Sequence, residues 1–415
     1  MAICARMVWL APGALPVLFL LVACAIEGVK AQGSVVSLEV IALGATVRSA
    51  PGTDAPRRGT VRQGTRLPMG KRVAGKGCAF WYELGPERFI CEDLVRPSME
   101  LPWGERLPRV PQGALLPHTY AFVSVDGTWA YARPEDYFYD QMIESLGRGF
   151  GVVVGEIREV RGVVFAKTLR GLWIPTESLR FCEPSNFRGV ELQDGRLDIA
   201  WVDHGGAALW EKTPKGFQRS FNRIPRRTLL RIQARLSTHL VQTDHGIVHE
   251  SELIWPTPVD APPPGIAPQE KWIDVDLRTQ TLVAYEGCRP VYATLISGGR
   301  GGREHETPIG LHRIWVKLAE APMDDLERSD VEANYSIEAV PWVQYFARGV
   351  GFHAAFWHDD FGRPRSHGCI NLAPLDARWL FEWTEPALPP GWDAIVTTPQ
   401  EPGTWVQVRR SLRSL

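Results

Sequence analysis

The sequence predicts a mainly β protein, in which small β-barrels in series precede a β-rich C-terminal domain with short helices. Three observations indicate this fold class. The 415 residues include 16 Trp and 33 Pro, which favour short strands, tight turns and flat contact surfaces over a helical bundle. A segment with one pattern recurs three times before residue 258. A proline-rich stretch then separates these repeats from a part of the chain with a different pattern.

The composition is that of a folded globular protein. Hydrophobic residues make up 45% of the chain and charged residues 22%, which excludes a disordered or collagen-like chain. The length is sufficient for two to four domains. The formal net charge is −1, so the chain lacks the basic field that holds a phosphate backbone. We therefore expect no nucleic-acid partner.

The first 31 residues have the pattern of an export signal. An apolar run over residues 14–26 is too short to span a bilayer comfortably and is interrupted by Pro16. The removal of this segment has two interpretations. A third is that the segment is retained as an anchor. The run Leu21-Val22-Ala23-Cys24 resembles a bacterial lipobox, whose lipidated Cys24 would tether the chain to a membrane, whereas Val29-Lys30-Ala31 would permit cleavage before Gln32. We expect the rest of the chain in the periplasm or cell envelope.

The repeated segment consists of an aromatic or aliphatic pair, acidic residues and a leucine, with a proline upstream at a spacing of 43, 45 or 39 positions. Short alternating runs and glycine turns lie between these features, which is typical of small β-barrels. We predict barrels at residues 35–100, 113–184 and 190–258. The three copies are Phe89–Leu94, Trp173–Leu179 and Ile247–Leu253, preceded by Pro51, Pro134 and Pro214.

This arrangement resembles bacterial SH3-like modules, which commonly bind cell-wall peptides. Aromatic side chains within the three units would then face a ligand or form the barrel cores, and the sequence favours the cores. These side chains are Trp81, Tyr82, Trp173 and Trp201.

Five cysteines follow the predicted signal, and an odd number leaves at least one thiol free in an exported chain. Cys78 and Cys91 flank a predicted hairpin whose geometry suits a disulfide. The other three are Cys182, Cys288 and Cys369.

A proline-rich linker at residues 256–269 precedes the C-terminal domain, which we place at residues 270–398. Alternating residues predict a β-hairpin, and apolar residues at helical spacing predict one short helix. Residues 319–351 fit no element and are a candidate insertion over the cleft, and residues 399–415 are expected to be a frayed tail. The expected strands cover residues 272–277, 281–285, 291–297, 311–318 and 392–397; the glycine cluster 298–302 is expected to be a mobile loop and the helix to cover 374–383.

Two short runs in this domain carry chemistry: Phe352-His353-Ala354 and Ser366-His367-Gly368-Cys369-Ile370-Asn371. A free thiol is a weak nucleophile near neutral pH and needs a base, which either histidine could supply. Gly368 permits close approach of a substrate carbonyl, and the backbone N–H groups of Gly368 and Cys369 could form an oxyanion pocket. Arg363 and Arg365 add positive potential. The pattern indicates acyl transfer.

These runs, together with Ile273-Asp-Val-Asp-Leu277 and Thr307-Pro308-x-Gly310, resemble the L,D-transpeptidase catalytic domain of the YkuD family. The resemblance implies Cys369 as the nucleophile and His353 as its acid/base, oriented by the carbonyl of Ala354. His367 and Gly368 would shape the oxyanion region. The remaining implied site residues, which hold the loop or line the substrate cleft, are Ser366, Arg365, Asn371, Trp342 and Tyr345.

The family reaction implies peptidoglycan stem peptides as partners and no metal or other cofactor. The thiol would attack a tetrapeptide stem, release D-Ala and pass the acyl group to an amine, which forms a crosslink, or to water, which makes the enzyme a carboxypeptidase. Three other interpretations stay open: a non-catalytic wall-binding protein, a disulfide from Cys369 to Cys288 or Cys182, and a zinc site. The zinc ligands would be His353, His358, Asp359, His367 and Cys369.

Overall fold

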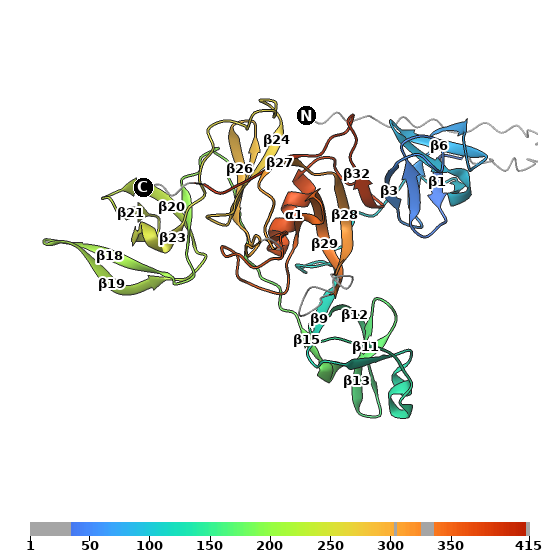
Figure 1. Ribbon diagram of the computed structural model, residues 1–415, viewed down its shortest axis with the longest axis horizontal. Coiled ribbons are helices and arrows are strands. Elements are labelled where there is room, and N and C mark those ends of the chain that lie inside the picture. The colour runs from blue at the N-terminus through green and yellow to red at the C-terminus, as the bar shows by residue number, and fades with distance from the viewer. Residues whose placement is uncertain (1–34, 303–304, 325–335, 412–415) are drawn as a thin grey trace, which may run out of the picture. The chain divides into compact units, whose positions relative to one another are not determined.

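A computed structural model describes residues 35–302, 305–324 and 336–411. The predicted export signal, with Cys24, lies outside these residues. Residues 35–415 group into one compact unit. Among the described residues, no helix has the length and apolar character needed to cross a bilayer. The mainly β fold class is confirmed, since strands greatly outnumber helices along the chain (Figure 1).

The first repeat unit, residues 35–100, consists of short antiparallel strands. β1 pairs with β4 and β8, and β2 pairs with β3 and β7. Its strands are β1 (Ser37–Val40), β2 (Ala45–Arg48), β3 (Arg57–Val61), β4 (Arg66–Pro68), β5 (Lys71–Ala74), β6 (Phe80–Gly85), β7 (Arg88–Cys91) and β8 (Val95–Ser98).

The second repeat unit, residues 113–184, repeats this antiparallel arrangement, with β9 between β12 and β15. A 3-10 helix, η2 (Pro134–Tyr139), follows β10. Its strands are β9 (Thr119–Val123), β10 (Thr128–Tyr131), β11 (Met142–Leu146), β12 (Gly151–Val160), β13 (Val163–Thr168), β14 (Trp173–Pro175) and β15 (Leu179–Phe181).

The third repeat unit, residues 190–258, contains a long hairpin of β18 and β19 and a smaller one of β21 and β22. Its first strand, β16, pairs instead with β26 of the C-terminal domain. Its strands are β16 (Val190–Glu191), β17 (Ile199–Val202), β18 (Ala207–Thr213), β19 (Gly216–Ile224), β20 (Leu229–Arg235), β21 (Leu240–Thr243), β22 (Gly246–His249) and β23 (Leu253–Ile254).

The acidic part of the repeated segment forms the same structure in all three units. It makes a single 3-10 turn, which is followed directly by the strand that begins at or next to the leucine: η1 (Glu92–Leu94), η3 (Thr176–Ser178) and η4 (Glu250–Glu252). The repeat that the sequence indicates is therefore a structural repeat. The likeness to SH3 modules stays a prediction.

The aromatic residues considered for ligand binding form cores instead. Trp81, Tyr82, Trp173 and Trp201 are all buried, and Trp201 is fully enclosed. Their rings therefore contribute apolar burial rather than a contact surface. The predicted disulfide between Cys78 and Cys91 is present.

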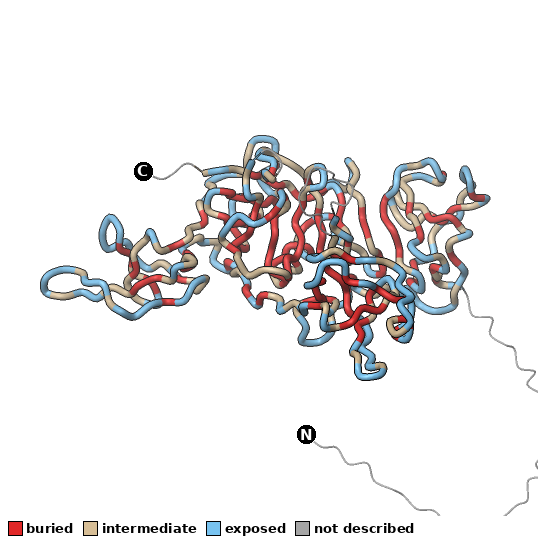
Figure 2. Tube along the Cα trace, turned by 60° about the horizontal axis from the view of Figure 1, so that its bottom comes forward, coloured by how far each residue is buried: buried red, intermediate tan, exposed pale blue. Residues whose placement is uncertain are grey.

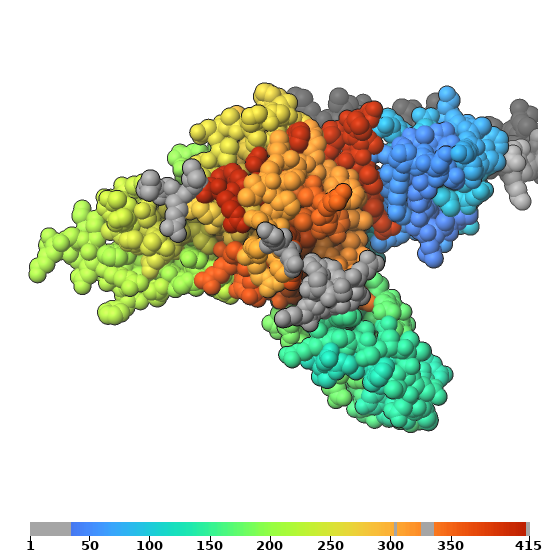
Figure 3. Space-filling view, viewed as in Figure 1, coloured from blue at the N-terminus to red at the C-terminus, as the bar shows by residue number. Residues whose placement is uncertain are grey.

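The C-terminal domain consists of two sheets and one helix. The first sheet has the order β16-β26-β25-β24-β33-β27, and the second runs β32-β28-β29-β30-β31. In Figure 3 the residues of the C-terminal domain, coloured yellow through orange to red, form one continuous surface. The elements are β24 (Lys271–Asp276), β25 (Thr281–Glu286), β26 (Arg289–Leu295), β27 (Gly310–Arg313), β28 (Val316–Asp324), β29 (Ser336–Ala347), β30 (Val350–Ala354), β31 (Ile370–Leu372), α1 (Pro374–Trp383), β32 (Trp392–Val396) and β33 (Trp405–Arg409).

Apolar side chains of both sheets and of α1 form one buried cluster, which includes Val275, Phe352 and Leu380. In Figure 2 the buried stretches gather toward the inside of the trace, and the exposed stretches lie mostly at its periphery. The helix was predicted at these residues, and Pro374 occupies its first turn. Asp376 of α1 is fully buried and accepts hydrogen bonds from the Tyr292 hydroxyl at 2.6 Å and the Gly189 N–H at 2.7 Å, which join the helix to the first sheet.

The expectation of a frayed tail over residues 399–415 is wrong for Trp405–Arg409. These residues form β33, which lies between β24 and β27 in the first sheet. Val406 and Val408 are fully buried, and the guanidinium of Arg409 pairs with the buried carboxylates of Asp274 at 2.7 Å and Asp276 at 3.3 Å. The domain therefore extends past residue 398.

Two other expectations also need correction. The predicted strand 311–318 is two strands, because the chain passes from the first sheet to the second between β27 and β28. Most of the unassigned segment 319–351 forms the rest of β28, β29 and the start of β30, which the sequence did not predict. That the segment is an insertion over the cleft stays a prediction. Residues 325–335 of that segment lie outside the described residues.

Candidate active site

His353 and Cys369 are positioned by two adjacent parallel strands. β30 pairs with β31 so that His353 lies opposite Asn371. Cys369 directly precedes β31, in the bend that leads into this strand. The side chains of His353 and Cys369 both line one cavity.

The His353 imidazole is almost completely buried, with 2% of its surface exposed. Its Nδ1–H donates to the carbonyl oxygen of Ala354 at 3.1 Å, which leaves Nε2 as the free base. The Trp357 ring stacks on it with centroids 5.6 Å apart. Burial lowers the pKa of His353 to about 4, although the bond to Ala354 opposes that shift. The imidazole is therefore neutral at neutral pH.

Cys369 is half-buried and carries a free thiol, which donates to the Gly349 carbonyl oxygen at 3.6 Å. Burial raises the pKa of this thiol above its ordinary value, and a hydrogen bond with the Gly351 backbone partly opposes the rise. Both groups of the pair are consequently uncharged at rest. The arrangement suits a base that removes the thiol proton during reaction rather than a preformed thiolate.

The loop before Cys369 is held by two hydroxyl groups. Ser366 accepts the Gly368 N–H at 3.0 Å and donates to the Cys369 carbonyl oxygen. Thr307 donates to the Gly368 carbonyl oxygen at 2.7 Å. Gly368 has φ of +128°, a conformation that favours glycine. Because the Gly368 N–H is already bonded within the loop, it does not fit the expected role of an oxyanion donor.

The glycine cluster 298–302 contributes to this framework. Gly298 accepts the Ser366 N–H at 3.1 Å through its carbonyl, and the Arg300 N–H donates to the Ser366 carbonyl at 3.1 Å. The Gly299 N–H donates to Thr307 Oγ1 at 3.0 Å. The first half of the cluster is thus bonded to the loop that carries Cys369, which differs from the expectation of a mobile loop.

The cavity has a volume of about 320 Å³, at the lower end of the range for small-ligand sites. Both apolar and polar side chains line it. Its lining residues are Phe122, Gly149, Met323, Ile337, Gly349, His353, Trp357, Arg365, Ser366, His367, Cys369 and Asn371.

Arginine and histidine side chains gather at and next to the cavity. Arg300 Nη2 lies 2.6 Å from His367 Nε2, and the His305 ring meets the His367 ring edge-on at 4.5 Å. Arg365 also lines the cavity and pairs with Asp360 at 3.2 Å. The guanidinium groups of Arg300 and Arg365 suit a substrate that carries a carboxylate.

The expected site residues divide into two groups. His353, Arg365, Ser366, His367, Cys369 and Asn371 line the cavity, with Gly368 in the loop between them. Asn371 is 3% exposed, and its side-chain amide lies 2.9 Å from His358 Nε2. Tyr345 lies opposite Gly351 across β29 and β30 without lining the cavity, and its ring stacks near Trp315. Trp342 is buried elsewhere.

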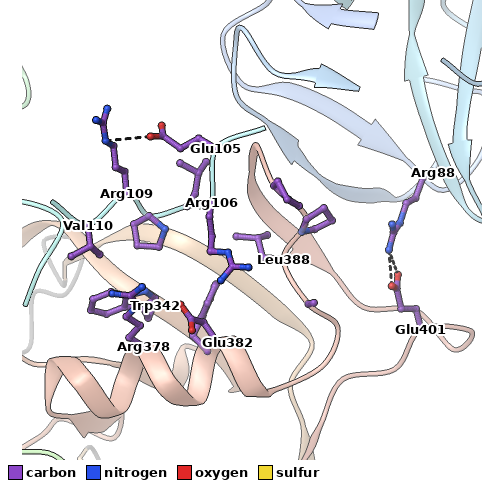
Figure 4. A pocket seen from close by; sticks show the side chains of 16 residues that line it. Arg88, Glu105, Arg106, Arg109, Val110, Trp342, Arg378, Glu382, Leu388 and Glu401 are labelled. Atoms are coloured by element: carbon purple, nitrogen blue, oxygen red, sulfur yellow. Dashed lines mark hydrogen bonds and ion pairs between the residues drawn. The ribbon is translucent and has the colours of Figure 1, made fainter. Parts of the chain in front are cut away.

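Trp342 lines a larger cavity of about 730 Å³, which Figure 4 shows. Its charged lining is largely self-compensated, since Arg109 pairs with Glu105 at 3.3 Å and Arg88 with Glu401 at 2.6 Å. Among the described residues that line it there is neither a cysteine nor a histidine. Size therefore does not identify the reactive cavity, and Trp342 is not part of the site around Cys369.

Two alternatives for Cys369 do not fit the structure. Its thiol is free, so the disulfide alternative is wrong. The proposed zinc ligands do not gather, because Asp359 is bonded to Arg226 at 3.1 Å and also to Arg227. Within the described ranges, the one group of such side chains with ligand atoms within 4.8 Å of one another is Cys78, Cys91 and Asp93, whose thiols form the disulfide.

Sequence reasoning missed several residues of this site. Phe122 and Gly149 belong to the second repeat unit, and no local pattern links them to Cys369. Trp357 follows His353 by four residues and could have been noted as a nearby aromatic. Arg300 could also have been noted as a candidate, because it lies inside the glycine cluster.

Comparison with known proteins finds similar sequences for the part of the chain that contains this site. Residues 270–408 match the family model of the L,D-transpeptidase catalytic domain, YkuD. The putative L,D-transpeptidase YciB of Bacillus subtilis (strain 168) is 26% identical over 152 residues, which cover 34% of this chain and 74% of that protein.

Solved structures give similar local matches. The Ldtfm–avibactam carbamoyl enzyme is 26% identical, with a TM-score of 0.27, over 34% of this chain and 50% of that chain. The catalytic domain from the E. faecium L,D-transpeptidase, determined by NMR, is 25% identical, with a TM-score of 0.26, over 34% of this chain and 98% of that one. The match thus spans half the length of the Ldtfm–avibactam carbamoyl enzyme.

Proposed function

We propose that the chain is a cysteine acyltransferase that acts on peptidoglycan stem peptides through residues 270–408, which match the model of the L,D-transpeptidase catalytic domain, YkuD. The observation that carries the proposal is that His353 of β30 and Cys369, which directly precedes the adjacent strand β31, line one cavity. The guanidinium of Arg365, which lines the same cavity, suits the carboxylates of a stem peptide.

The first half of the reaction forms a thioester. Cys369 gives its proton to Nε2 of His353 while Sγ attacks the carbonyl carbon of the third stem residue. The bond to the terminal D-Ala then breaks, and the imidazolium returns the proton to the departing amine. The bond from His353 Nδ1–H to Ala354 holds the ring so that Nε2 is the atom that exchanges this proton.

The second half transfers the acyl group. An amine of a neighbouring stem attacks the thioester carbonyl, His353 takes the amine proton, and the proton passes to the departing Sγ of Cys369. The product is a crosslink between two stems. If water attacks instead, the product is a tripeptide and the enzyme is an L,D-carboxypeptidase. We propose crosslinking as the principal outcome and export to the periplasm or cell envelope as its setting, with Cys24 as a candidate lipid attachment site.

Incubation of residues 33–415 with a purified disaccharide-tetrapeptide, followed by mass spectrometry, tests the proposal. We expect release of D-Ala and formation of a dimer. Cys369→Ala should lower D-Ala release by more than ~10³-fold, because it removes the nucleophile of the first step.

Cys288→Ala is the matched control, since Cys288 is a free and exposed thiol that does not line the cavity. It should react like the unsubstituted chain. Full activity in Cys369→Ala would refute the mechanism. Release of D-Ala with tripeptide as the sole product would replace crosslinking with the carboxypeptidase reaction.

A further inference from the structure

The second repeat unit supplies part of the wall of the reactive cavity. Phe122 of β9 and Gly149, which precedes β12, line the cavity that contains His353 and Cys369. All other lining residues belong to the C-terminal domain. The second repeat unit, which the sequence suggests as a separate module, thus lines the same cavity as His353 and Cys369.

Aromatic packing fixes this unit to the C-terminal domain. The Tyr120 ring stacks on Phe356 with centroids 3.9 Å apart, and its hydroxyl donates to the Ala339 carbonyl oxygen at 2.7 Å. Tyr120 and Phe122 belong to the same buried cluster as Phe352 of the C-terminal domain. Separating the unit would expose this apolar surface to water, so the wall is rigid.

Backbone contacts reinforce the attachment. Gly151 pairs in parallel with Ile337, and the Val153 N–H donates to Glu338 Oε2 at 3.0 Å. A Cβ at Gly151 would lie 3.0 Å from side-chain atoms of both Ile337 and Phe122. A larger side chain at residue 151 would therefore crowd both Ile337 and Phe122.

Phe122 is one of several apolar residues that line the cavity. The others include Met323, Ile337 and Trp357, whereas Arg365, Ser366, His367 and Asn371 give it polar groups. The carbon atoms of the apolar residues give a hydrolytic water no hydrogen-bond partner. They can instead pack against the hydrocarbon part of a peptide side chain that carries the attacking amine.

We propose that Phe122 is a specificity-determining residue that seats the acyl acceptor and favours an amine over water at the thioester of Cys369. This inference rests on the proposed function and extends it to the choice of acceptor. Phe122 acts after D-Ala has left. Its loss should therefore change the products more than the rate of D-Ala release.

The test measures two quantities with residues 33–415 and the disaccharide-tetrapeptide: the rate of D-Ala release and the ratio of dimer to tripeptide. Phe122→Ala should lower the ratio of dimer to tripeptide roughly tenfold, the scale on which apolar contacts discriminate substrates, and this loss should exceed any loss in the rate of D-Ala release. Phe122→Leu, which keeps an apolar side chain and is less disruptive if the Ala variant fails to fold, should give an intermediate ratio.

Trp129→Ala is the control, because Trp129 is an exposed aromatic residue of the same unit that does not line the cavity. It should match the unsubstituted chain in both quantities. An unchanged product ratio in both Phe122 variants, with normal D-Ala release, overturns the inference and leaves the proposed function standing. Absence of D-Ala release from the unsubstituted chain overturns both, and tripeptide as its sole product overturns the preference for an amine.

Discussion

His353 and Cys369 are each held in the uncharged form by their surroundings. Burial disfavours both the imidazolium and the thiolate, and neither residue has a carboxylate or guanidinium partner among its hydrogen bonds in the described part of the chain. Forming an imidazolium and a thiolate here would therefore cost free energy. Because the thiolate is the reactive form of a cysteine, a neutral pair keeps the resting thiol less reactive.

Alkylation of Cys369 by iodoacetamide tests this resting state. In a Cys288→Ala background, we expect the rate to increase with pH and to be still increasing at pH 9, because burial raises the pKa of the thiol and only the thiolate reacts. Mass spectrometry of the peptide that contains Cys369 measures the rate. A plateau below pH 7 would instead indicate a thiolate paired with a protonated His353.

At the scale of the element, α1 ends on an unusual cap. Lys317 of β28 is fully buried, and its Nζ donates to the carbonyl oxygens of Phe381 at 2.7 Å and Thr384 at 2.8 Å. These carbonyls lie at the C-terminal end of the helix, where a cation is favourable. Burial nevertheless lowers the pKa of Lys317 to about 7, helped by the charge of Lys271.

This cap makes the stability of the protein depend on pH. Between pH 7 and the ordinary lysine pKa, the unfolded chain holds a proton on Lys317 that the folded chain lacks, so stability rises with pH. From pH 7 to pH 9 the free energy of unfolding should gain about 1–3 kcal/mol relative to Lys317→Met. Thermal unfolding of both proteins at pH 6.5 and 9 measures the difference. Curves that shift in parallel would mean that Lys317 titrates normally.

Local patterns predict some elements of this domain and miss others. The hairpin of β24 and β25 follows from alternation, and α1 follows from helical spacing and Pro374. β33 was missed, although Val406 and Val408 alternate as in a strand, because the basic residues around it suggest surface. The partners of Arg409 are the buried Asp274 and Asp276, more than 130 positions away, and a local pattern cannot reveal that pairing.

The site divides in the same way. Cys369 and His353 were found because their spacing and neighbours form a motif. The sequence did not point to Phe122, because its place at the cavity depends on the packing of Tyr120 against Phe356 and on the close approach of Gly151 to Ile337. Such contacts between distant parts of the chain carry no periodic signal, and only the folded structure contains them.

Across the whole molecule, each repeat unit shares a buried cluster with the C-terminal domain. Trp392 completes the core of the first unit, Trp201 of the third unit packs in the cluster of Trp272, and Tyr120 of the second lies in the cluster of Phe352. Domains joined by flexible linkers would each bury their own surface. The described residues should therefore unfold together rather than unit by unit.

Tyr120→Phe tests this cooperativity. Removing the hydroxyl leaves the buried Ala339 carbonyl without its donor, which should cost about 1–3 kcal/mol. Differential scanning calorimetry of residues 33–415 should give one transition, moved as a whole to lower temperature. Tyr139→Phe is the matched control, because Tyr139 of the same unit is 61% exposed, and it should leave the transition in place. Two separate transitions, of which Tyr120→Phe moves one, would mean that the second unit is an independent domain and that the wall it gives to the cavity can open.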